Sequence, residues 1–247
     1  MDKYGLIGFP LEHSFSKDYF NNKFAAEKID AEYVNFEITS VAELKSIVKD
    51  PQLKGLNVTI PYKEQVIPYL DQLSENAKLI GAVNVIKIDR VKKKIKLTGF
   101  NSDIIGFKQS IEPLLKSHHQ RALILGNGGA AKAVFYGLQQ LGLTSTYVSR
   151  QKTSEQMLTY SELSPEVMET YEVIVNCTPV GMWPNVDDCP AIPYQLLTDK
   201  HLLYDLLYNP NETLFMQKGE EQGAAVKNGL EMLLLQAFAG WNFWNQK

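Results

Sequence analysis

The sequence predicts an α/β protein made of two units. Its 247 residues are long for one compact domain and sufficient for two domains of roughly 100 to 150 residues each. Short apolar runs alternate with helical patterns along the whole chain, and such alternation predicts mostly parallel sheets covered on both faces. The segment LILGNGGAAKAV (123–134) also has the strand, glycine turn and helix of a dinucleotide-binding motif.

The first half of the chain supplies the elements of the first unit. Alternating apolar and polar residues predict strands, and apolar residues spaced three and four apart predict helices. We expect strands at 4–9, 33–38 and 56–60, helices at 16–29, 41–49 and 73–82, and a hairpin of strands 84–88 and 94–99. The unit is expected to end where a helix begins after Asp103.

The second half has a more regular rhythm. We expect strands at 122–126, 146–150, 172–178, 201–208 and 224–228, with helical segments between them and a helix at 130–142. The last helix has an apolar face, which is predicted to consist of Leu230, Leu233, Leu234, Ala237, Phe238 and Trp241. This pattern predicts a second sheet covered by helices on both faces.

Composition excludes several classes of partner. The net charge is −3, from 25 basic and 28 acidic residues, so we expect binding neither to nucleic acid nor to an anionic membrane. No segment approaches the length of apolar chain that spans a bilayer, and the first ten residues lack a secretory pattern. Two widely separated cysteines indicate a reducing compartment, the cytoplasm. The four histidines show no ligand spacing, so no metal is predicted.

The glycine turn has the context that dinucleotide binding requires. In the pattern G-x-G-x-x-[GA] its positions are Gly126, Gly128 and Ala131. The first glycine allows a tight turn, the second lets the backbone approach a pyrophosphate, and the helix N-terminus offers free N–H groups to the phosphates. The predicted cofactor-binding residues of the turn are Gly126, Asn127, Gly128, Gly129 and Ala130. The alternative is a plain tight turn between strand and helix.

The end of the next strand indicates which dinucleotide is bound. An NAD site places Asp or Glu there, to bond the adenosine ribose. This chain has Ser149 and Arg150, followed by Gln151 and Lys152. An arginine beside a hydroxyl suits a 2′-phosphate, so NADP is favoured. The alternative is that Arg150 is an ordinary surface arginine.

Hydride transfer to a carbonyl also needs a proton donor beside the developing alkoxide. A lysine partly removed from water at a strand end can act as that donor, and a nearby carboxylate can orient it. Lys63 follows the run LNVTIPY, and Asp103 ends GFNSD at the start of a helix. Taken singly, Lys63 is compatible with a surface lysine and Asp103 with a helix N-cap.

Six segments, taken together, resemble the motifs of shikimate dehydrogenase. They are FPLEHSFS (9–16), NVTIPYK (57–63), GAVNV (81–85), GFNSD (99–103), GNGGAAKA (126–133) and NGLEMLLLQA (228–237). They occur in that family's order and cover nearly the whole chain. The resemblance implies reversible NADPH-dependent reduction of 3-dehydroshikimate to shikimate, in aromatic amino acid (chorismate) biosynthesis.

The resemblance also assigns roles to individual residues. It implies that Lys63 and Asp103 are the catalytic pair, while Asn57 supports the strand end. The implied substrate-binding residues are Ser14, Ser16, Thr59 and Tyr208 on the carboxylate, and Asn84 and Gln236 on the ring hydroxyls. Leu206 and Gly229 would lie on the nicotinamide side of the cofactor. Polar side chains at the end of a buried strand are then explained, because a ligand satisfies them.

The architecture implied by the family is a substrate-binding domain and a Rossmann-type NADP domain. The first would span residues 1–103 and be completed by the C-terminal helix, 229–247, and the second would span 104–228. The family places the active site in the cleft between the two domains, and closing it would exclude water. The expected partner is the small-molecule substrate, and the chain would be a monomer or a homodimer.

Two segments depart from the family pattern. Ser149-Arg150-Gln151 stands where the family commonly has Asn-Arg-Thr, although Lys152 or Thr153 could compensate for the lost threonine, and Ser102 stands where threonine is usual. One alternative function is a quinate enzyme that uses NAD. Ser16 argues against it, since a bulkier threonine there is associated with quinate enzymes, and Arg150 argues against NAD. A second alternative is a non-catalytic NADP sensor, which would not need Lys63 and Asp103.

Overall fold

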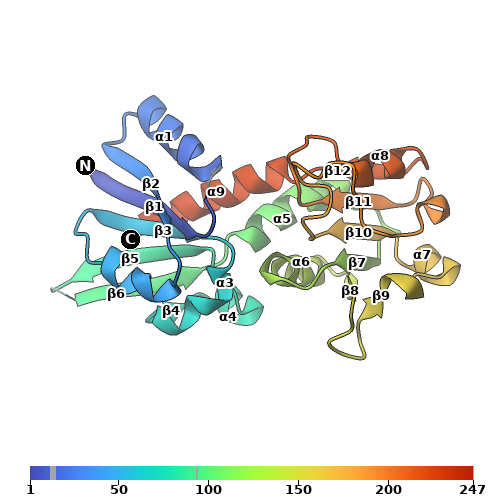
Figure 1. Cartoon of the computed structure of the whole chain (residues 1–247), viewed down its shortest axis with the longest axis horizontal. Coiled ribbons are helices and arrows are strands. Elements are labelled where there is room, and N and C mark those ends of the chain that lie inside the picture. Colours follow the sequence, from blue (N-terminus) through green and yellow to red (C-terminus); the bar gives the residue numbers. More distant parts are fainter. Residues whose placement is uncertain (12–14, 93, 247) are drawn as a thin grey trace. The chain divides into compact units, whose positions relative to one another are not determined.

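A computed structural model describes residues 1–11, 15–92 and 94–246 of the chain (Figure 1). The chain divides into two compact units. The first comprises Met1–Ser102 and Ala237–Lys247, and the second comprises Asp103–Gln236. This division places Asp103 and residues 229–236 in the second unit, whereas the family pattern implies that they belong to the substrate domain.

The first unit is built on a six-stranded mixed sheet with the order β2-β1-β3-β5-β6-β4. Strand β1 pairs in parallel with both β2 and β3, while β5 pairs antiparallel with β3 and β6. The predicted hairpin is therefore confirmed. The strands are β1 (Asp2–Gly8), β2 (Ala31–Glu37), β3 (Leu53–Val58), β4 (Gln72–Leu73), β5 (Val85–Val91) and β6 (Lys94–Phe100).

Helices cover both faces of this first sheet. They are α1 (Phe15–Glu27), α2 (Leu44–Ile47), α3 (Tyr62–Gln65), α4 (Glu75–Ile80) and the C-terminal part of α9 (Leu230–Asn245). One core joins Leu44 and Val66 to strand residues such as Leu56. The other core joins Phe20 and Trp244 to the opposite face of the sheet. Helix α1 begins at Phe15, one residue before the predicted start.

The second unit contains six parallel strands in the order β12-β11-β10-β7-β8-β9. The order reverses between β7 and β10, which is the topological switch point at which doubly wound sheets bind ligands. The strands are β7 (Arg121–Leu125), β8 (Thr144–Ser149), β9 (Leu158–Thr159), β10 (Val173–Asn176), β11 (Leu202–Asp205) and β12 (Ala225–Lys227). The predicted strand at 201–208 ends early, because the chain leaves the sheet after Asp205.

Alternate residues of these strands build two cores, as the period of two requires. Ala122 and Ile124 of β7 face the core that contains Phe107 and Val134. Leu123 and Leu125 face the opposite core. The helices of this unit are α5 (Asp103–Ile111), α6 (Gly129–Gln140), α7 (Pro165–Thr170), α8 (Leu214–Glu220) and the N-terminal part of α9. Helices α5 and α6 supply the first core, and α7 and α8 supply the second.

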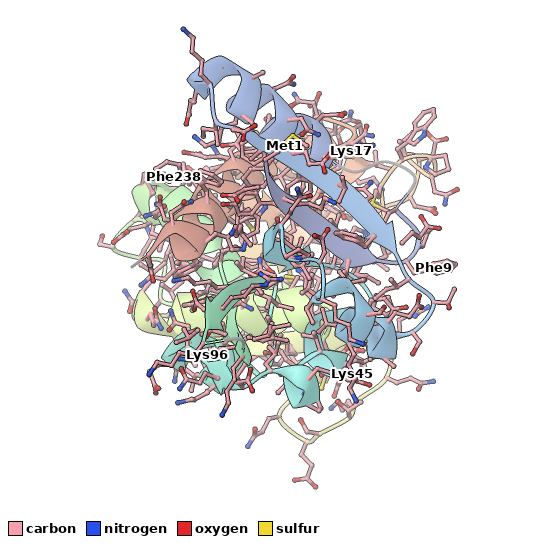
Figure 2. The ribbon with its side chains drawn as sticks, turned by 90° about the vertical axis from the view of Figure 1, so that its left-hand side faces the viewer. Met1, Phe9, Lys17, Lys45, Lys96 and Phe238 are labelled. Atoms are coloured by element: carbon pink, nitrogen blue, oxygen red, sulfur yellow. The ribbon has the colours of Figure 1, made fainter. Side chains whose placement is uncertain are left out.

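The apolar face predicted for the last helix is only partly buried. Ala237 is buried, but Leu230 and Leu234 are each 39% exposed and Phe238 is 53% exposed; Phe238 is visible at the surface in Figure 2. The C-terminal half of α9 instead packs through Trp244, whose Nε1 donates to the Ile86 carbonyl oxygen at 3.1 Å. A Cβ atom on Gly55 would lie 2.3 Å from this indole, so glycine there lets the helix approach the sheet.

Candidate functional site

The glycine turn lies at the switch point of the second sheet. Gly126 follows β7 with φ +99°, a conformation that favours glycine. Its N–H donates to the Val148 carbonyl oxygen at 2.8 Å, which anchors the turn to β8. A Cβ atom on Gly126 would lie 3.1 Å from Cγ2 of Thr178, just after β10. The turn is thus enclosed between β7, β8 and β10.

The start of α6 is open to a ligand. Gly128 is the N-cap of this 12-residue helix, and it provides no side chain to cap the first N–H groups. A Cβ atom built on Gly128 would meet nothing within 4 Å, and both Asn127 and Gly128 are exposed. Backbone N–H groups at a helix N-terminus, with open space before them, fit the pyrophosphate of a dinucleotide. Gly129 and Ala130 form the first turn and are half-buried.

The end of β8 carries the side chains predicted to choose the dinucleotide. Ser149 is the last residue of the strand, in register with Thr159 of β9, and Arg150 is exposed immediately beyond it. Burial raises the pKa of Tyr160, and the nearby charge of Arg150 opposes that rise. Lys152 pairs with Glu162, with 2.6 Å between Nζ and Oε1, and Thr153 donates to the sulfur of Met157 at 3.0 Å. Lys152 and Thr153, the two residues that could compensate for Gln151, thus both have protein partners.

A chain of buried polar groups connects the strand ends of the first unit. The Tyr33 hydroxyl donates to Asn57 Oδ1 at 2.7 Å, and it is also hydrogen-bonded to Ser16. Asn57 Nδ2 in turn donates to the Asn84 carbonyl oxygen at 3.3 Å. These bonds link α1, β2, β3 and the residue before β5. Asn57 therefore supports the strand end, as expected.

Asn84 is also joined to the end of β6. Its Nδ2 donates to Ser102 Oγ at 2.9 Å, and its Oδ1 accepts the Ser102 N–H at 2.7 Å. Asn84 is 3% exposed and Ser102 is fully buried. Because Asp103 follows Ser102 directly, this pair of bonds fixes the backbone that leads into α5. The serine that replaces a threonine here keeps the hydroxyl that the bond requires.

The backbone of Lys63 is anchored to the same region. Lys63 lies in the short helix α3, directly after β3 and Pro61, and is half-buried. Its carbonyl oxygen accepts the N–H of Val83, next to Asn84, at 2.7 Å. Asp103 is the first residue of α5 and only 7% exposed. The two residues belong to different units, so their pairing stays a prediction.

The other predicted substrate residues of the first unit lie beside this network. Thr59 is half-buried, and its N–H donates to the Ile7 carbonyl oxygen at 2.9 Å, joining the ends of β3 and β1. Ser16 is half-buried in the first turn of α1. Ser14 falls outside the described residues. The first unit therefore brings Ser16, Thr59, Lys63 and Asn84 to one end of its sheet.

The second unit holds the remaining predicted residues. Leu206 and Tyr208 follow β11, and Tyr208 is 39% exposed. A Cβ atom on Gly229 would lie 2.1 Å from the Leu206 carbonyl oxygen, so only glycine leaves that loop in place. Gln236 is half-buried in α9, and its Nε2 donates to the Leu233 carbonyl oxygen at 3.0 Å.

Several buried polar residues were not predicted from the sequence. Tyr33 sits in an alternating strand, where tyrosine is an ordinary strand former. Asn176, Asp205 and Thr213 are each fully buried in the second unit. Acidic residues are rarely buried without partners, so the D in the apolar run HLLYDLLY (201–208) was the one available signal.

In the described ranges, no helix is long and apolar enough to cross a membrane. No group of three or more His, Cys, Asp or Glu residues among the same residues could hold a metal ion.

Known proteins resemble this chain over almost its full length. Residues 6–86 match the substrate-binding domain of shikimate dehydrogenases. Shikimate dehydrogenase (NADP(+)) of Clostridium beijerinckii is 37% identical over 260 residues, which cover 100% of this chain and 93% of that protein. The corresponding enzyme of Caldicellulosiruptor saccharolyticus is 35% identical over 99% of this chain and 92% of its own length.

A solved structure shares the fold as well. The crystal structure of shikimate dehydrogenase from Aquifex aeolicus is 36% identical, with a TM-score of 0.86, and the match covers 99% of this chain and 92% of that one. Three observations agree with membership of this family. They are the extent of the sequence identity, the open glycine turn at the switch point and the polar cluster at the strand ends of the first unit. The chain belongs to the shikimate dehydrogenase family.

Proposed function

We propose that this chain catalyses the reversible NADPH-dependent reduction of 3-dehydroshikimate to shikimate, a step in the biosynthesis of chorismate and the aromatic amino acids. The observation that carries the proposal is the match, over nearly the whole chain, to enzymes named shikimate dehydrogenase (NADP(+)). The open turn before α6 supports the cofactor part of the proposal. The polar strand ends of the first unit support the substrate part.

The turn and the end of β8 would hold the cofactor. N–H groups of Gly129 and Ala130, at the start of α6, would bond the pyrophosphate, and the absence of a side chain at Gly128 would allow close approach. Arg150 would bind the 2′-phosphate by charge and by paired N–H donors. Leu206 and Gly229 would lie against the nicotinamide side. When bound, NADPH supplies the hydride that reduces the carbonyl.

Lys63 and Asp103 would handle the proton. In reduction, the Lys63 ammonium gives a proton to the oxygen that develops negative charge, and in oxidation the neutral amine takes it back. The buried Asp103 carboxylate would orient Lys63 and the substrate hydroxyl. Hydrogen bonds between Asn84 and Ser102 hold the backbone immediately before Asp103, so this carboxylate has a fixed support.

Hydroxyl and amide side chains would recognise the rest of the substrate. Shikimate has one carboxylate and three hydroxyls. We assign the carboxylate to hydroxyl groups of Ser14, Ser16, Thr59 and Tyr208, and the ring hydroxyls to the amides of Asn84 and Gln236. A site built from such donors and acceptors rejects analogues that leave them unpaired.

The environment and assembly of the chain are part of the same proposal. A pathway enzyme that uses NADPH and carries two unpaired cysteines fits the cytoplasm. Its partners would be the small-molecule substrate and cofactor, with neither nucleic acid nor membrane involved. The chain would act as a monomer or a homodimer.

Initial rates with four combinations of substrate and cofactor test this function. The wild-type protein is mixed with shikimate or quinate, each with NADP⁺ or NAD⁺, and reduced cofactor is followed by its absorbance. We expect turnover with shikimate and NADP⁺ at a kcat/KM well above the other three. Comparable turnover of quinate would overturn the role of Ser16 in substrate choice, and comparable use of NAD⁺ would overturn that of Arg150. Tight NADP⁺ binding without turnover of either acid would favour a non-catalytic sensor.

A further inference from the structure

A buried carboxylate at the end of β11 has no role in the function proposed so far. Asp205 is fully buried and accepts three hydrogen bonds. Its Oδ1 accepts from Asn176 Nδ2 and from the Leu207 N–H, both at 3.0 Å. Its Oδ2 accepts from Thr213 Oγ1 at 2.7 Å. The carboxylate thus joins β10, the loop after β11 and the start of α8.

Asn176 extends this network to the loop after β10. Its Oδ1 accepts both the N–H of Thr178, at 3.0 Å, and the Thr178 hydroxyl, at 2.6 Å. Its carbonyl oxygen accepts the Leu206 N–H at 3.0 Å. Asn176, Asp205 and Thr213 form one cluster, which we call the strand-end triad. All three residues are fully buried.

The loop that carries Leu206 and Tyr208 is anchored in part by the strand-end triad. The Leu207 N–H donates to the Asp205 carboxylate, and the Leu206 N–H donates to the main-chain carbonyl oxygen of Asn176. The Leu207 carbonyl oxygen accepts the Gly229 N–H at 2.8 Å, and the Asn209 carbonyl oxygen accepts the Trp183 N–H at 3.1 Å. These backbone hydrogen bonds all join residues of the second unit. The loop is therefore fixed on both sides of Tyr208.

An ionised carboxylate suits this position better than a neutral group. Burial raises the pKa of Asp205 to about 6, and the bonds from Thr213, Leu207 and Asn176 oppose that rise. At neutral pH the group is therefore mostly ionised and able to accept all three bonds at once. Hydrogen bonds to a charged acceptor are roughly twice as strong as those between neutral groups. Apolar residues of similar volume often stabilise a protein as well as buried charged groups do. Stability alone is therefore a weak reason for a buried charge at this position.

We propose that Asp205 is a positioning residue, which works through Asn176 and Thr213 to hold Leu206 and Tyr208 where the nicotinamide and the substrate carboxylate require them. The inference rests on the proposed function, because it takes the roles of Leu206 and Tyr208 from there. In this proposal Asp205 contacts neither the cofactor nor the substrate.

Two variants probe the strand-end triad with little change of shape. Asp205→Asn keeps the volume and removes the charge. Its Oδ1 can still accept from Asn176 and Leu207, but Thr213 must turn its hydroxyl to accept from the new NH₂, and none of the three bonds is then charge-assisted. Thr213→Val removes the hydroxyl that donates to Asp205, and Thr213→Ser restores it. Thr213 also caps α8, since its Oγ1 accepts the Met216 N–H at 3.4 Å. Ser164→Ala is the matched control, because Ser164 caps α7 through the Val167 N–H, also at 3.4 Å, in the same unit.

Steady-state kinetics and hydrogen–deuterium exchange are then measured for all four variants. For Asp205→Asn and Thr213→Val, kcat/KM for shikimate should fall between about 10- and 100-fold, the loss typical of a displaced positioning element. The KM for NADP⁺ should stay within about twofold, because the cofactor is held mainly at α6 and β8. Thr213→Ser should restore most of the activity. Amides 206–209 should exchange faster in the first two variants and at the wild-type rate in Ser164→Ala.

Kinetics and exchange distinguish the outcomes. If Asp205→Asn and Thr213→Val lower the melting temperature as Ser164→Ala does, yet keep the wild-type kcat, KM and exchange of amides 206–209, the residue is merely structural and the inference is wrong. If the wild-type protein turns over no substrate, the proposed function fails first. Faster exchange of amides 206–209 alone would then still show that Asp205 holds the loop.

Discussion

Arg150 is the residue on which the choice of cofactor depends. It is exposed directly after β8, while the neighbouring Lys152 is paired with Glu162. A guanidinium that binds the 2′-phosphate of NADP through charge-assisted bonds contributes a few kcal/mol, whereas NAD has no 2′-phosphate for this side chain to bind. The preference for NADP should therefore be largely the property of one side chain.

Replacing Arg150 tests that assignment. In Arg150→Ala we expect the KM for NADP⁺ to rise about 10- to 100-fold, the value of one or two charge-assisted bonds, with the KM for NAD⁺ unchanged. Arg121→Ala is the matched control, because Arg121 is an exposed arginine at the opposite end of the same sheet. Equal effects of Arg150→Ala on both cofactors would show that the arginine does not read the 2′-phosphate.

Single residues of the site differ in how far the sequence predicts them. Lys63 and Asp103 stand out because polar groups interrupt apolar runs, and the family motifs give them roles. Tyr33 and Thr213 could not be singled out, because their importance depends on partners distant in the chain. Tyr33 bonds Asn57, and Thr213 bonds Asp205. A hydroxyl in a strand or before a helix has no sequence signature for such a partner.

Two glycines serve different purposes, one in packing and one in binding. Gly55 of β3 lies under Trp244 of α9, and a Cβ atom there would be 2.3 Å from the indole. Gly128 begins α6, and a Cβ atom there would meet nothing within 4 Å. Gly55 is thus required by packing inside the protein, whereas Gly128 leaves space in which a ligand could approach the backbone.

The matched substitutions should have opposite consequences. Gly55→Ala should destabilise the protein by about 1–3 kcal/mol, the usual cost of overpacking a core, and leave NADP⁺ affinity unchanged. Gly128→Ala should destabilise the protein by only about 0.5–1 kcal/mol, because alanine is a poorer N-cap than glycine, but it should weaken NADP⁺ binding because a methyl group fills the approach to the pyrophosphate. Denaturation midpoints and NADP⁺ titration measure the two effects. Unchanged NADP⁺ affinity in Gly128→Ala would contradict the cofactor site.

Helix α9 shows what periodicity leaves open at the scale of an element. Its residues are apolar almost all round, so the spacing allows more than one buried face. The predicted face included Leu230, Leu234 and Phe238, which are exposed. The buried positions follow instead from Gly55, which admits Trp244, and this contact joins residues far apart in the sequence. The existence of the helix was predictable, whereas its orientation depended on its partners.

At the scale of the whole molecule, the class of fold was predictable and the strand order was not. Alternating strands and helices indicated α/β units with parallel pairing, which the second sheet confirms. The antiparallel β5–β6 hairpin was visible from its two alternating runs. The short strands β4 and β9 carry too few residues for a pattern. The reversal of strand order between β7 and β10 depends on how the helices pack on the sheet, and no local sequence pattern indicates it.

A buried histidine of the second unit predicts a loss of stability at acid pH. His119 is 5% exposed, and its Nδ1 accepts the Lys116 N–H at 3.0 Å. Its Nε2 lies 3.0 Å from the Lys200 carbonyl oxygen, so the neutral ring satisfies both partners. Burial lowers the pKa of His119, and this effect outweighs the bond to the Lys200 carbonyl oxygen, which opposes it. The unfolded chain therefore binds a proton at higher pH than the folded one.

The sign of the pH effect follows by linkage. The stabilisation is fully present above the ordinary histidine pKa of about 6.5 and is lost as the pH falls toward the lowered pKa of the folded state. His119→Gln offers an acceptor and a donor without a titrating group. Between pH 7.5 and 5, the melting temperature of this variant should fall less than that of the wild type. The two melting temperatures should begin to diverge at about pH 6.5. Parallel melting curves at every pH would show that His119 does not titrate as argued.

In the proposed mechanism, Lys63 transfers the proton in shikimate oxidation by NADP⁺. We would therefore compare kcat for the wild type, Lys63→Ala and Lys96→Ala, since Lys96 is an exposed lysine of β6 (Figure 2). We predict that kcat falls about 10²- to 10⁴-fold in Lys63→Ala, as expected for loss of a general acid–base group, with NADP⁺ affinity intact and Lys96→Ala fully active. A Lys63→Ala variant with a kcat near that of the wild type would contradict the account.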